Sequence, residues 1–259
     1  MAILIAESKT MLNPTGPVDP DILKAHTPFF QNEANDIAYA LSQLGINDIV
    51  EKFKMTPTLA QKAVRLAYDF PYKEMSDEAI KLFSGEVFRA IDFPALSEEV
   101  KNKFYNNVRI ISSLYGMLRP DDYIKPYRLE FKAPIGPDSS PLTKFWKKKV
   151  TILLGKEIKE SGDNVILNLL PGDAAACIDF KLIKAFAKVI KPDFRILTKD
   201  GMVRNPYTGE LKAARGALLT EILEKNTPLD NLTEMESQNF IYAPDLSKPG
   251  LPVFIRIIK

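Results

Sequence analysis

Two segments of the sequence alternate aromatic rings with basic side chains. The first runs from Tyr115 to Arg119, and the second runs from Lys125 through Tyr127 to Arg128. Aromatic rings stack on nucleobases, and a guanidinium group binds two phosphate oxygens at once. These residue types therefore indicate a site for nucleic acid or another anion. The alternative is that the cations are ordinary surface charge and that both tyrosines belong to the core.

Two further groups of polar and basic residues point to the same chemistry. Lys9 and Thr10 follow a short apolar run at residues 2–6, which is typical of a buried strand. Loops at the carboxyl ends of strands are where open α/β sheets usually bind ligands. Lys212 and Arg215 are three residues apart in a predicted helix, so they share one face near its start, which favours anions. Solvated surface charge is the alternative for each pair.

The basic residues are unevenly distributed along the chain of 259 residues, whose formal net charge is only +2. Residues 1–100 contain 9 Lys and Arg against 15 Asp and Glu, whereas residues 101–150 contain 11 against 4, a net charge of +7. Such a local basic block is the electrostatic pattern of a polyanion binder. A solvated lysine-rich helix face would give the same count.

Other chemistries find little support in the sequence. His26 and Cys177 are the single histidine and cysteine, which excludes an internal disulfide and the usual structural zinc spacings. Cys177 has apolar neighbours and no adjacent cation, so we expect a buried, inert thiol. Glycine-rich phosphate loops are missing. We therefore expect no cofactor and no metal site, and the sequence favours a function other than catalysis.

The hydrophobic patterns predict how these residues are positioned. We expect strands at 2–6, 108–111, 165–170, 194–198 and 252–258, and helices at 29–44, 142–160, 180–190 and 210–225. Residues 121–140 show little periodicity and are expected to be irregular and exposed. Strands and helices mix without strict alternation, which predicts an α+β (irregular α/β) fold, with a mixed central sheet flanked by helices in one domain over residues 1–259.

The sequence also predicts where the protein resides. No run of about 18 apolar residues is present, so we expect no membrane partner. The apolar run at residues 2–6 has no basic residues before it and is too short for a secretory leader. We therefore expect a cytoplasmic protein.

Several motifs in a fixed order carry a family resemblance. The most specific is Leu114-Tyr115-Gly116-Met117-Leu118-Arg119-Pro120, followed by Pro126-Tyr127-Arg128-Leu129-Glu130. Phe83-Ser84-Gly85-Glu86-Val87 precedes them, and Asn168-Leu169 and Lys212-Ala213-Ala214-Arg215-Gly216 follow. With these motifs the whole chain resembles the peroxide-stress YaaA family.

The resemblance implies a function and a site. Members of the family are associated with survival of hydrogen peroxide, through lowering the iron available for Fenton chemistry. Their fold resembles that of a DNA binder with a positively charged cleft and a helix-hairpin-helix, which we would place near residues 112–118. The matching residues then imply a cleft that binds DNA phosphates without reading sequence. Its members would be Lys9, Arg119, Arg128, Lys212 and Arg215, with Tyr115 and Tyr127 as ring partners or wall.

Two departures from the family pattern leave other functions open. Glu7-Ser8 stands where the family has Pro-Ala, and the segment from Leu170 to Ala174 stands where it has Ala-Ser-x-Glu-Tyr. If the latter segment carries chemistry in relatives, that chemistry is altered here. An enzyme acting on a small anionic or nucleotide-like substrate in the same cleft is one alternative function. Direct iron sequestration by carboxylates is another.

Overall fold

The computed structural model describes residues 2–71, 75–162 and 164–258. Its helices are α1 (Pro20–Ala25), α2 (Gln31–Ser42), α3 (Ile46–Phe53), α4 (Pro57–Asp69), α5 (Ala79–Leu82), α6 (Glu86–Ile91), α7 (Glu98–Asn107), α8 (Leu142–Ser161), α9 (Gly172–Ala175), α10 (Phe180–Ile183) and α11 (Thr208–Lys225). Its strands are β1 (Ala2–Ala6), β2 (Asp77–Glu78), β3 (Val108–Ser112), β4 (Gly116–Leu118), β5 (Tyr123–Ile124), β6 (Val165–Asn168), β7 (Lys188–Ile190), β8 (Asp193–Leu197), β9 (Val203–Arg204), β10 (Glu236–Ser237), β11 (Phe240–Tyr242) and β12 (Val253–Ile257).

The first sheet has the order β4-β3-β1-β6-β7, with β1 at its centre. Strands β3, β1, β6 and β7 are parallel, and only the edge strand β4 is antiparallel to its neighbour. Ile3, Leu4 and Ile5 are almost fully buried, because helices cover both faces of this sheet. This burial on both faces explains why β1 is an apolar run. Glu7 is the first residue after the carboxyl end of β1.

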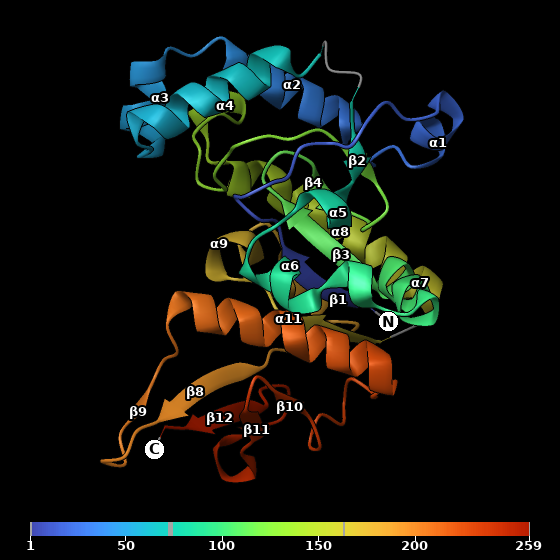
Figure 1. Cartoon of the computed structure of the whole chain (residues 1–259), viewed down its shortest axis with the longest axis vertical. Helices are drawn as coiled ribbons and strands as arrows, with labels where there is room; N and C mark the ends of the chain where they lie inside the picture. The colour runs from blue at the N-terminus through green and yellow to red at the C-terminus, as the bar shows by residue number, and fades with distance from the viewer. Residues whose placement is uncertain (1, 72–74, 163, 259) are drawn as a thin grey trace.

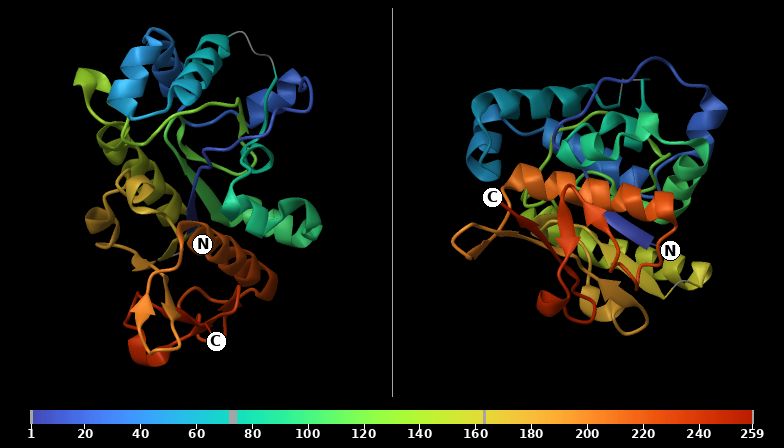
Figure 2. Two further views of the ribbon diagram at one scale, coloured as in Figure 1. Left: turned by 60° about the vertical axis from the view of Figure 1, so that its left-hand side comes forward. Right: turned by 60° about the horizontal axis from the view of Figure 1, so that its bottom comes forward.

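A second sheet, β10-β11-β12-β8-β9, lies on the far side of α11 (Figures 1 and 2). Its central pair, β12 and β8, is parallel, and the other pairs are antiparallel. A layer formed by α2, α3 and α4 lies at the opposite end of the molecule (Figure 1). The α+β class with mixed sheets is therefore confirmed. The strands are divided between two larger sheets and the small pair β2-β5, where one central sheet was expected.

Close approach of two helices fixes α11 against α6. A Cβ atom added at Gly216 would lie 2.3 Å from the carbonyl oxygen of Val87 on α6. Only glycine allows the two backbones to approach this closely. The contact places the amino-terminal half of α11 beside the segment that follows β1.

Three local expectations are wrong. Residues 180–190 form a single helical turn, α10, followed by the edge strand β7, because Val189 and Ile190 pair with β6. Residues 112–118 form a β-hairpin between β3 and β4 and no helix-hairpin-helix; Gly116 has a φ of 72° in it. Residues 121–140 are irregular as expected, yet many of their side chains are buried, including Ile124, Leu129 and Phe131.

Among the described residues, no helix combines the length and the apolarity that crossing a bilayer requires. The single domain over residues 1–259 stays a prediction.

Candidate anion-binding cleft

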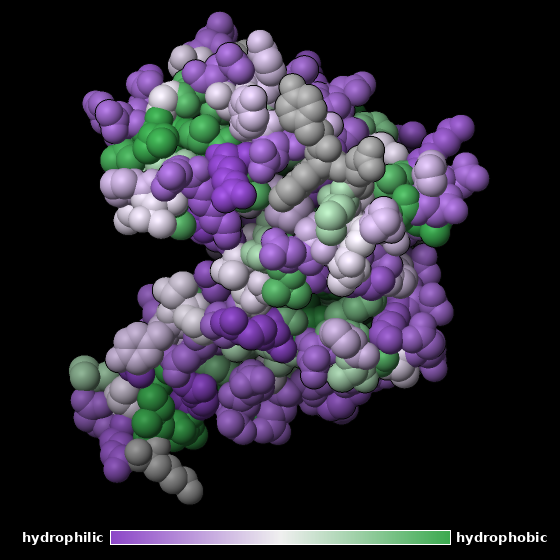
Figure 3. Space-filling view, turned by 45° about the horizontal axis from the view of Figure 1, so that its top comes forward, coloured by the Kyte–Doolittle hydropathy of each residue, from purple (hydrophilic) through white to green (hydrophobic). Residues whose placement is uncertain are grey.

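A cleft of about 840 Å³ opens at the carboxyl end of β1. Residues 5–10 lie along its floor, the end of α3 lines one side, and α6 and α11 line the other. In Figure 3 the molecule is hollowed between the layer of α2 to α4 and the part that contains α11, and strongly hydrophilic residues lie on both rims among less polar ones. The cleft therefore lies where a parallel sheet of this kind is expected to bind a ligand.

Basic residues outnumber acidic ones in the cleft lining. The cations are Lys9, Lys52, Lys54, Arg89, Lys132, Lys212 and Arg215, and the carboxylates are Glu7, Glu86, Glu130 and Asp173. Some of these charges neutralise each other: Lys9 pairs with Glu130, Arg89 with Glu86, and Lys132 with Asp173 at 2.7 Å. Within the described part of the chain, no carboxylate forms an ion pair with Lys54, Lys212 or Arg215. The cleft therefore has an excess of positive charge on both sides.

Arg215 is the most constrained of the three unpaired cations. It is part-buried on α11, and its guanidinium makes no hydrogen bond or ion pair to any described residue. Burial lowers the pKa of Arg215, and the charge of Asp193 opposes this shift. A guanidinium withdrawn from water without a partner is costly, and an anion in the cleft would relieve that cost.

The start of α11 is already occupied by a protein carboxylate. Glu210 accepts a hydrogen bond of 2.9 Å from the backbone N–H of Tyr207, and it also pairs with Arg256. The free N–H groups expected to attract an anion at this helix start are thus partly satisfied. Anion binding on α11 would depend on the side chains of Lys212 and Arg215.

The floor of the cleft contains a carboxyl group, Glu7, in a network of donors. The backbone N–H of Ser113 donates to Glu7 at 2.8 Å, its hydroxyl donates at 2.6 Å, and the phenol of Tyr127 donates as well. Burial raises the pKa of Glu7 from 4.5 to about 7, although the bonds from Ser113 and Tyr127 act in the opposite direction. A carboxyl group whose pKa burial raises into this range is typical of catalytic acids and bases.

Arg128 supports the cleft from behind. Its side chain is only 13% exposed, and it donates to the carbonyl oxygen of Lys9 at 3.0 Å and to Glu130 at 3.2 Å. These bonds fix the backbone at Lys9 and orient the carboxylate that pairs with the Lys9 amine. Arg128 thus positions the cleft wall and does not line the cleft.

The nine residues expected to form one site are divided among several places. Lys9, Thr10, Lys212 and Arg215 line the cleft together, whereas Tyr127 and Arg128 lie behind its lining, against Glu7 and Lys9. Arg119 lies beside a separate cavity of about 170 Å³ and pairs with Asp122 at 3.0 Å. Tyr115 and Lys125 line a third cavity. The sequence motifs therefore do not converge on one surface.

Sequence reasoning missed part of the cleft lining. Lys52 and Lys54 come from the end of α3, where Lys54 takes a left-handed φ of 54°, and Arg89 comes from α6. Nothing in the sequence pattern distinguishes these cations from surface charge.

Two alternative chemistries can be compared with the structure. Among residues 2–71, 75–162 and 164–258, no group of three or more His, Cys, Asp or Glu side chains could hold a metal ion. Cys177 is fully buried, and burial raises the pKa of its thiol to about 12. A thiol in this state is a poor nucleophile toward peroxide.

The fold and the cleft define an α+β protein with a basic cleft at the end of a mostly parallel sheet. Residues 1–246 match the family model described as peroxide stress protein YaaA. A UPF0246 protein of Parabacteroides distasonis is 34% identical over 199 residues, which cover 76% of each chain. A UPF0246 protein of Shewanella sp. (strain MR-4) is 28% identical over 262 residues and 99% of each chain. The chain belongs to the peroxide stress protein YaaA family.

The two segments that the resemblance sets apart, at Glu7-Ser8 and at Leu170 to Ala174, both contribute to the cleft. Strands β1 and β6 are parallel neighbours, with Leu4 opposite Asn168, so the segments that follow them lie side by side. Glu7 and Ser8 therefore share the cleft lining with Pro171 and Asp173.

Proposed function

We propose that this protein serves the cytoplasmic response to peroxide stress by binding DNA in the cleft, and that it thereby limits iron-dependent Fenton damage. Membership of the YaaA family supports the role in peroxide stress. The observation that carries the DNA proposal is the presence of Lys54, Lys212 and Arg215 in one cleft without described carboxylate partners. Cations of this kind neutralise backbone phosphates.

The arrangement of the cations favours binding without sequence specificity. Lys54 belongs to the end of α3, whereas Lys212 and Arg215 belong to α11, so a phosphate backbone between them would be contacted from both sides. Contacts to phosphate position a nucleic acid but do not read its bases. The proposed ligand is therefore duplex or structured DNA of any sequence.

Protection would follow from occupying DNA rather than from storing iron. The described residues provide no cluster of metal-binding side chains, so they support no storage site. We propose that bound protein shields the sugar-phosphate backbone from radicals generated nearby.

Fluorescence anisotropy with two unrelated 20-base-pair duplexes tests the proposal. The logarithm of the association constant should fall linearly with the logarithm of salt concentration, by about 0.9 for each phosphate neutralised. Both duplexes should give the same slope, and Arg215→Met should weaken binding to both. A matched control is Lys184→Met, which removes an exposed cation outside the cleft. Binding that ignores salt, or an unchanged affinity of Arg215→Met, would refute the DNA proposal.

The second candidate function is an enzyme that acts on a small anionic or nucleotide-like substrate. The observation that favours it is the buried carboxyl group of Glu7 on the floor of the same cleft, where burial raises its pKa to about 7. Lys212 and Arg215 would hold the anionic group while Glu7 accepts or returns a proton.

A thermal-shift screen of nucleotides and phosphate esters separates the two functions. Marked stabilisation by one compound, lost in Arg215→Met, supports an enzyme or a small-ligand receptor. If every compound stabilises equally weakly while duplex DNA binds, the DNA function stands and the enzyme proposal fails.

A further inference from the structure

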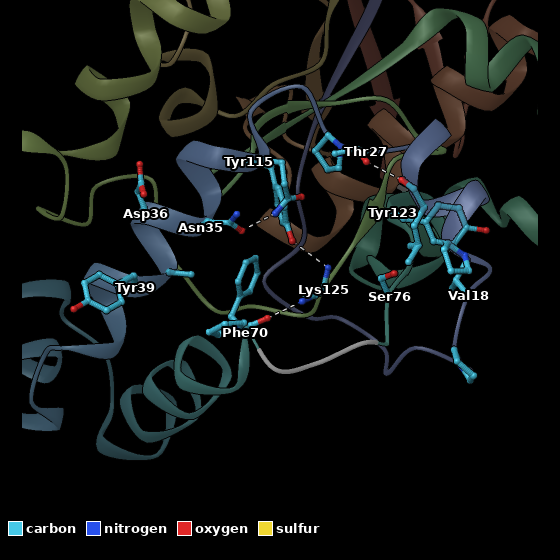
Figure 4. A pocket seen from close by; sticks show the side chains of 17 residues that line it. Val18, Thr27, Asn35, Asp36, Tyr39, Phe70, Ser76, Tyr115, Tyr123 and Lys125 are labelled. Carbon is cyan, nitrogen blue, oxygen red and sulfur yellow. Dashed lines mark hydrogen bonds between the residues drawn. The ribbon is translucent and has the colours of Figure 1, made fainter.

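A second cavity, of about 950 Å³, lies between the α1–α2 region and the segment that contains β5 (Figure 4). It shares no lining residue with the cleft. The rings of Phe70, Tyr115 and Tyr123 line it, together with several prolines, so much of its surface is flat and apolar. Its volume lies in the range of small-molecule sites, and such a lining suits a planar ligand.

Lys125 provides the only positive charge among the described residues that line this cavity. Its Nζ atom donates to the carbonyl oxygen of Phe70 at 2.7 Å and lies 5.3 Å from the centre of the Phe70 ring. It forms no ion pair with a described carboxylate. Asp36 is the only acidic residue among the described lining residues, and it is exposed and lies away from Lys125 in Figure 4. The ammonium group thus keeps two N–H donors for a ligand.

Two hydroxyl groups in the lining of this cavity donate no hydrogen bond to a described residue. The oxygen of Tyr115 accepts a bond of 3.1 Å from the backbone N–H of Lys125, but its own O–H has no acceptor among the described residues. Ser76 is only 5% exposed, and its hydroxyl has no hydrogen-bond partner among the residues that the structure describes. Buried hydroxyl groups of this kind usually have a partner, so these two donors indicate a polar ligand atom.

We propose that this cavity binds a small aromatic carboxylate. Its ring would lie against Phe70 and Tyr115, and its carboxylate would accept hydrogen bonds from Lys125, from the Tyr115 hydroxyl and from Ser76. A carboxylate suits the site better than a phosphate dianion, because one lysine balances one negative charge in a half-buried position. Desolvation lowers the pKa of Lys125, and a bound carboxylate would oppose that shift.

Calorimetric titration of the full chain with 2-naphthoate tests the proposal. The matched neutral probe is 2-naphthamide, which has the same ring and nearly the same shape. The charged probe should bind at least about tenfold more tightly than the neutral one, since it alone accepts charge-assisted bonds from Lys125. Equal affinities, or no binding of 2-naphthoate, would overturn the proposal.

Three variants locate the binding. Lys125→Met keeps the aliphatic stem and should weaken 2-naphthoate binding about tenfold or more. Ser76→Ala should weaken it several-fold, and it remains informative if Lys125→Met does not fold. Lys212→Met changes the cleft alone and should leave the affinity for 2-naphthoate unchanged. Unchanged binding in both Lys125→Met and Ser76→Ala, or loss of binding in Lys212→Met, would refute the site.

Discussion

The hydroxyl of Ser113 donates to Oε1 of Glu7 across 2.6 Å, and the backbone N–H of the same residue donates to Oε2 across 2.8 Å. One serine in the β3–β4 turn thus satisfies both oxygens of the carboxyl group at the cleft floor. Trp146 fixes this turn, because its indole N–H donates to the carbonyl oxygen of Ser113 at 2.8 Å. The position of Glu7 is therefore set by the first sheet and by α8 together.

The protonation of Glu7 should make folding stability depend on pH. Its pKa is raised from 4.5 to about 7, so the folded state holds the proton more tightly than the unfolded chain does. The resulting stabilisation is complete below about pH 4.5 and is lost as the pH rises through about 7. Relative to Glu7→Gln, the wild type should lose on the order of 3 kcal/mol of unfolding free energy across this range.

Urea denaturation at several pH values measures this difference. Glu224→Gln, which changes an exposed glutamate on α11, is the control and should follow the wild-type curve. If the curves of Glu7→Gln and wild type run parallel between pH 4.5 and about 8, the proposed environment of Glu7 is wrong.

The contact between α11 and α6 should be sensitive to a single methyl group. A Cβ atom at position 216 would overlap the carbonyl oxygen of Val87, so Gly216→Ala should destabilise the fold by about 1–3 kcal/mol. Gly209 lies in the first turn of the same helix with nothing within 4 Å of an added Cβ. Gly209→Ala should therefore be neutral or stabilise by up to about 1 kcal/mol. Equal effects of the two changes on the thermal midpoint would contradict this packing.

Arg119 should matter for stability and not for DNA binding. It pairs with Asp122, whose side chain is only 3% exposed, and lies outside the cleft. Arg119→Met would remove the guanidinium from Oδ1 of this buried carboxylate and keep only the backbone N–H bond to Oδ2, at a cost of about 1–3 kcal/mol. Arg65→Met, which breaks an exposed pair of 3.9 Å with Asp69, should cost less than about 1 kcal/mol. A loss of DNA affinity in folded Arg119→Met would place the binding surface elsewhere.

Local sequence patterns predicted the elements that local energetics determine. The apolar run of β1 and the helical periods of α8 and α11 were recognisable, and these three elements begin and end within two residues of the expected bounds. Strand β7 was not recognisable, because Val189 and Ile190 are extended through their pairing with β6, which is a tertiary contact. The helical period of residues 180–190 does not indicate that their last residues pair with another strand.

The candidate site was predictable in part for a similar reason. Lys9 and Lys212 line the same cleft because β1 ends beside α6 and α11 begins beside it. The sequence pattern predicted the positions of both β1 and α11. Tyr115 and Lys125 were grouped with them by residue type alone. The β3–β4 hairpin turns Tyr115 inward, toward a different cavity. A sequence that alternates aromatic and basic residues therefore identifies candidate binding residues, but it does not show which of them line the same cavity.

The most direct test asks whether cations from the two sides of the cleft act on one DNA molecule. Lys54→Met on the α3 side, Lys212→Met on the α11 side and the double variant should be compared with Lys184→Met by anisotropy over a range of salt concentrations. Each single change should flatten the salt slope by about 0.9, and the double variant by about twice that amount. If only one side changes the slope, or if Lys184→Met changes it equally, the cleft is not the DNA-binding site.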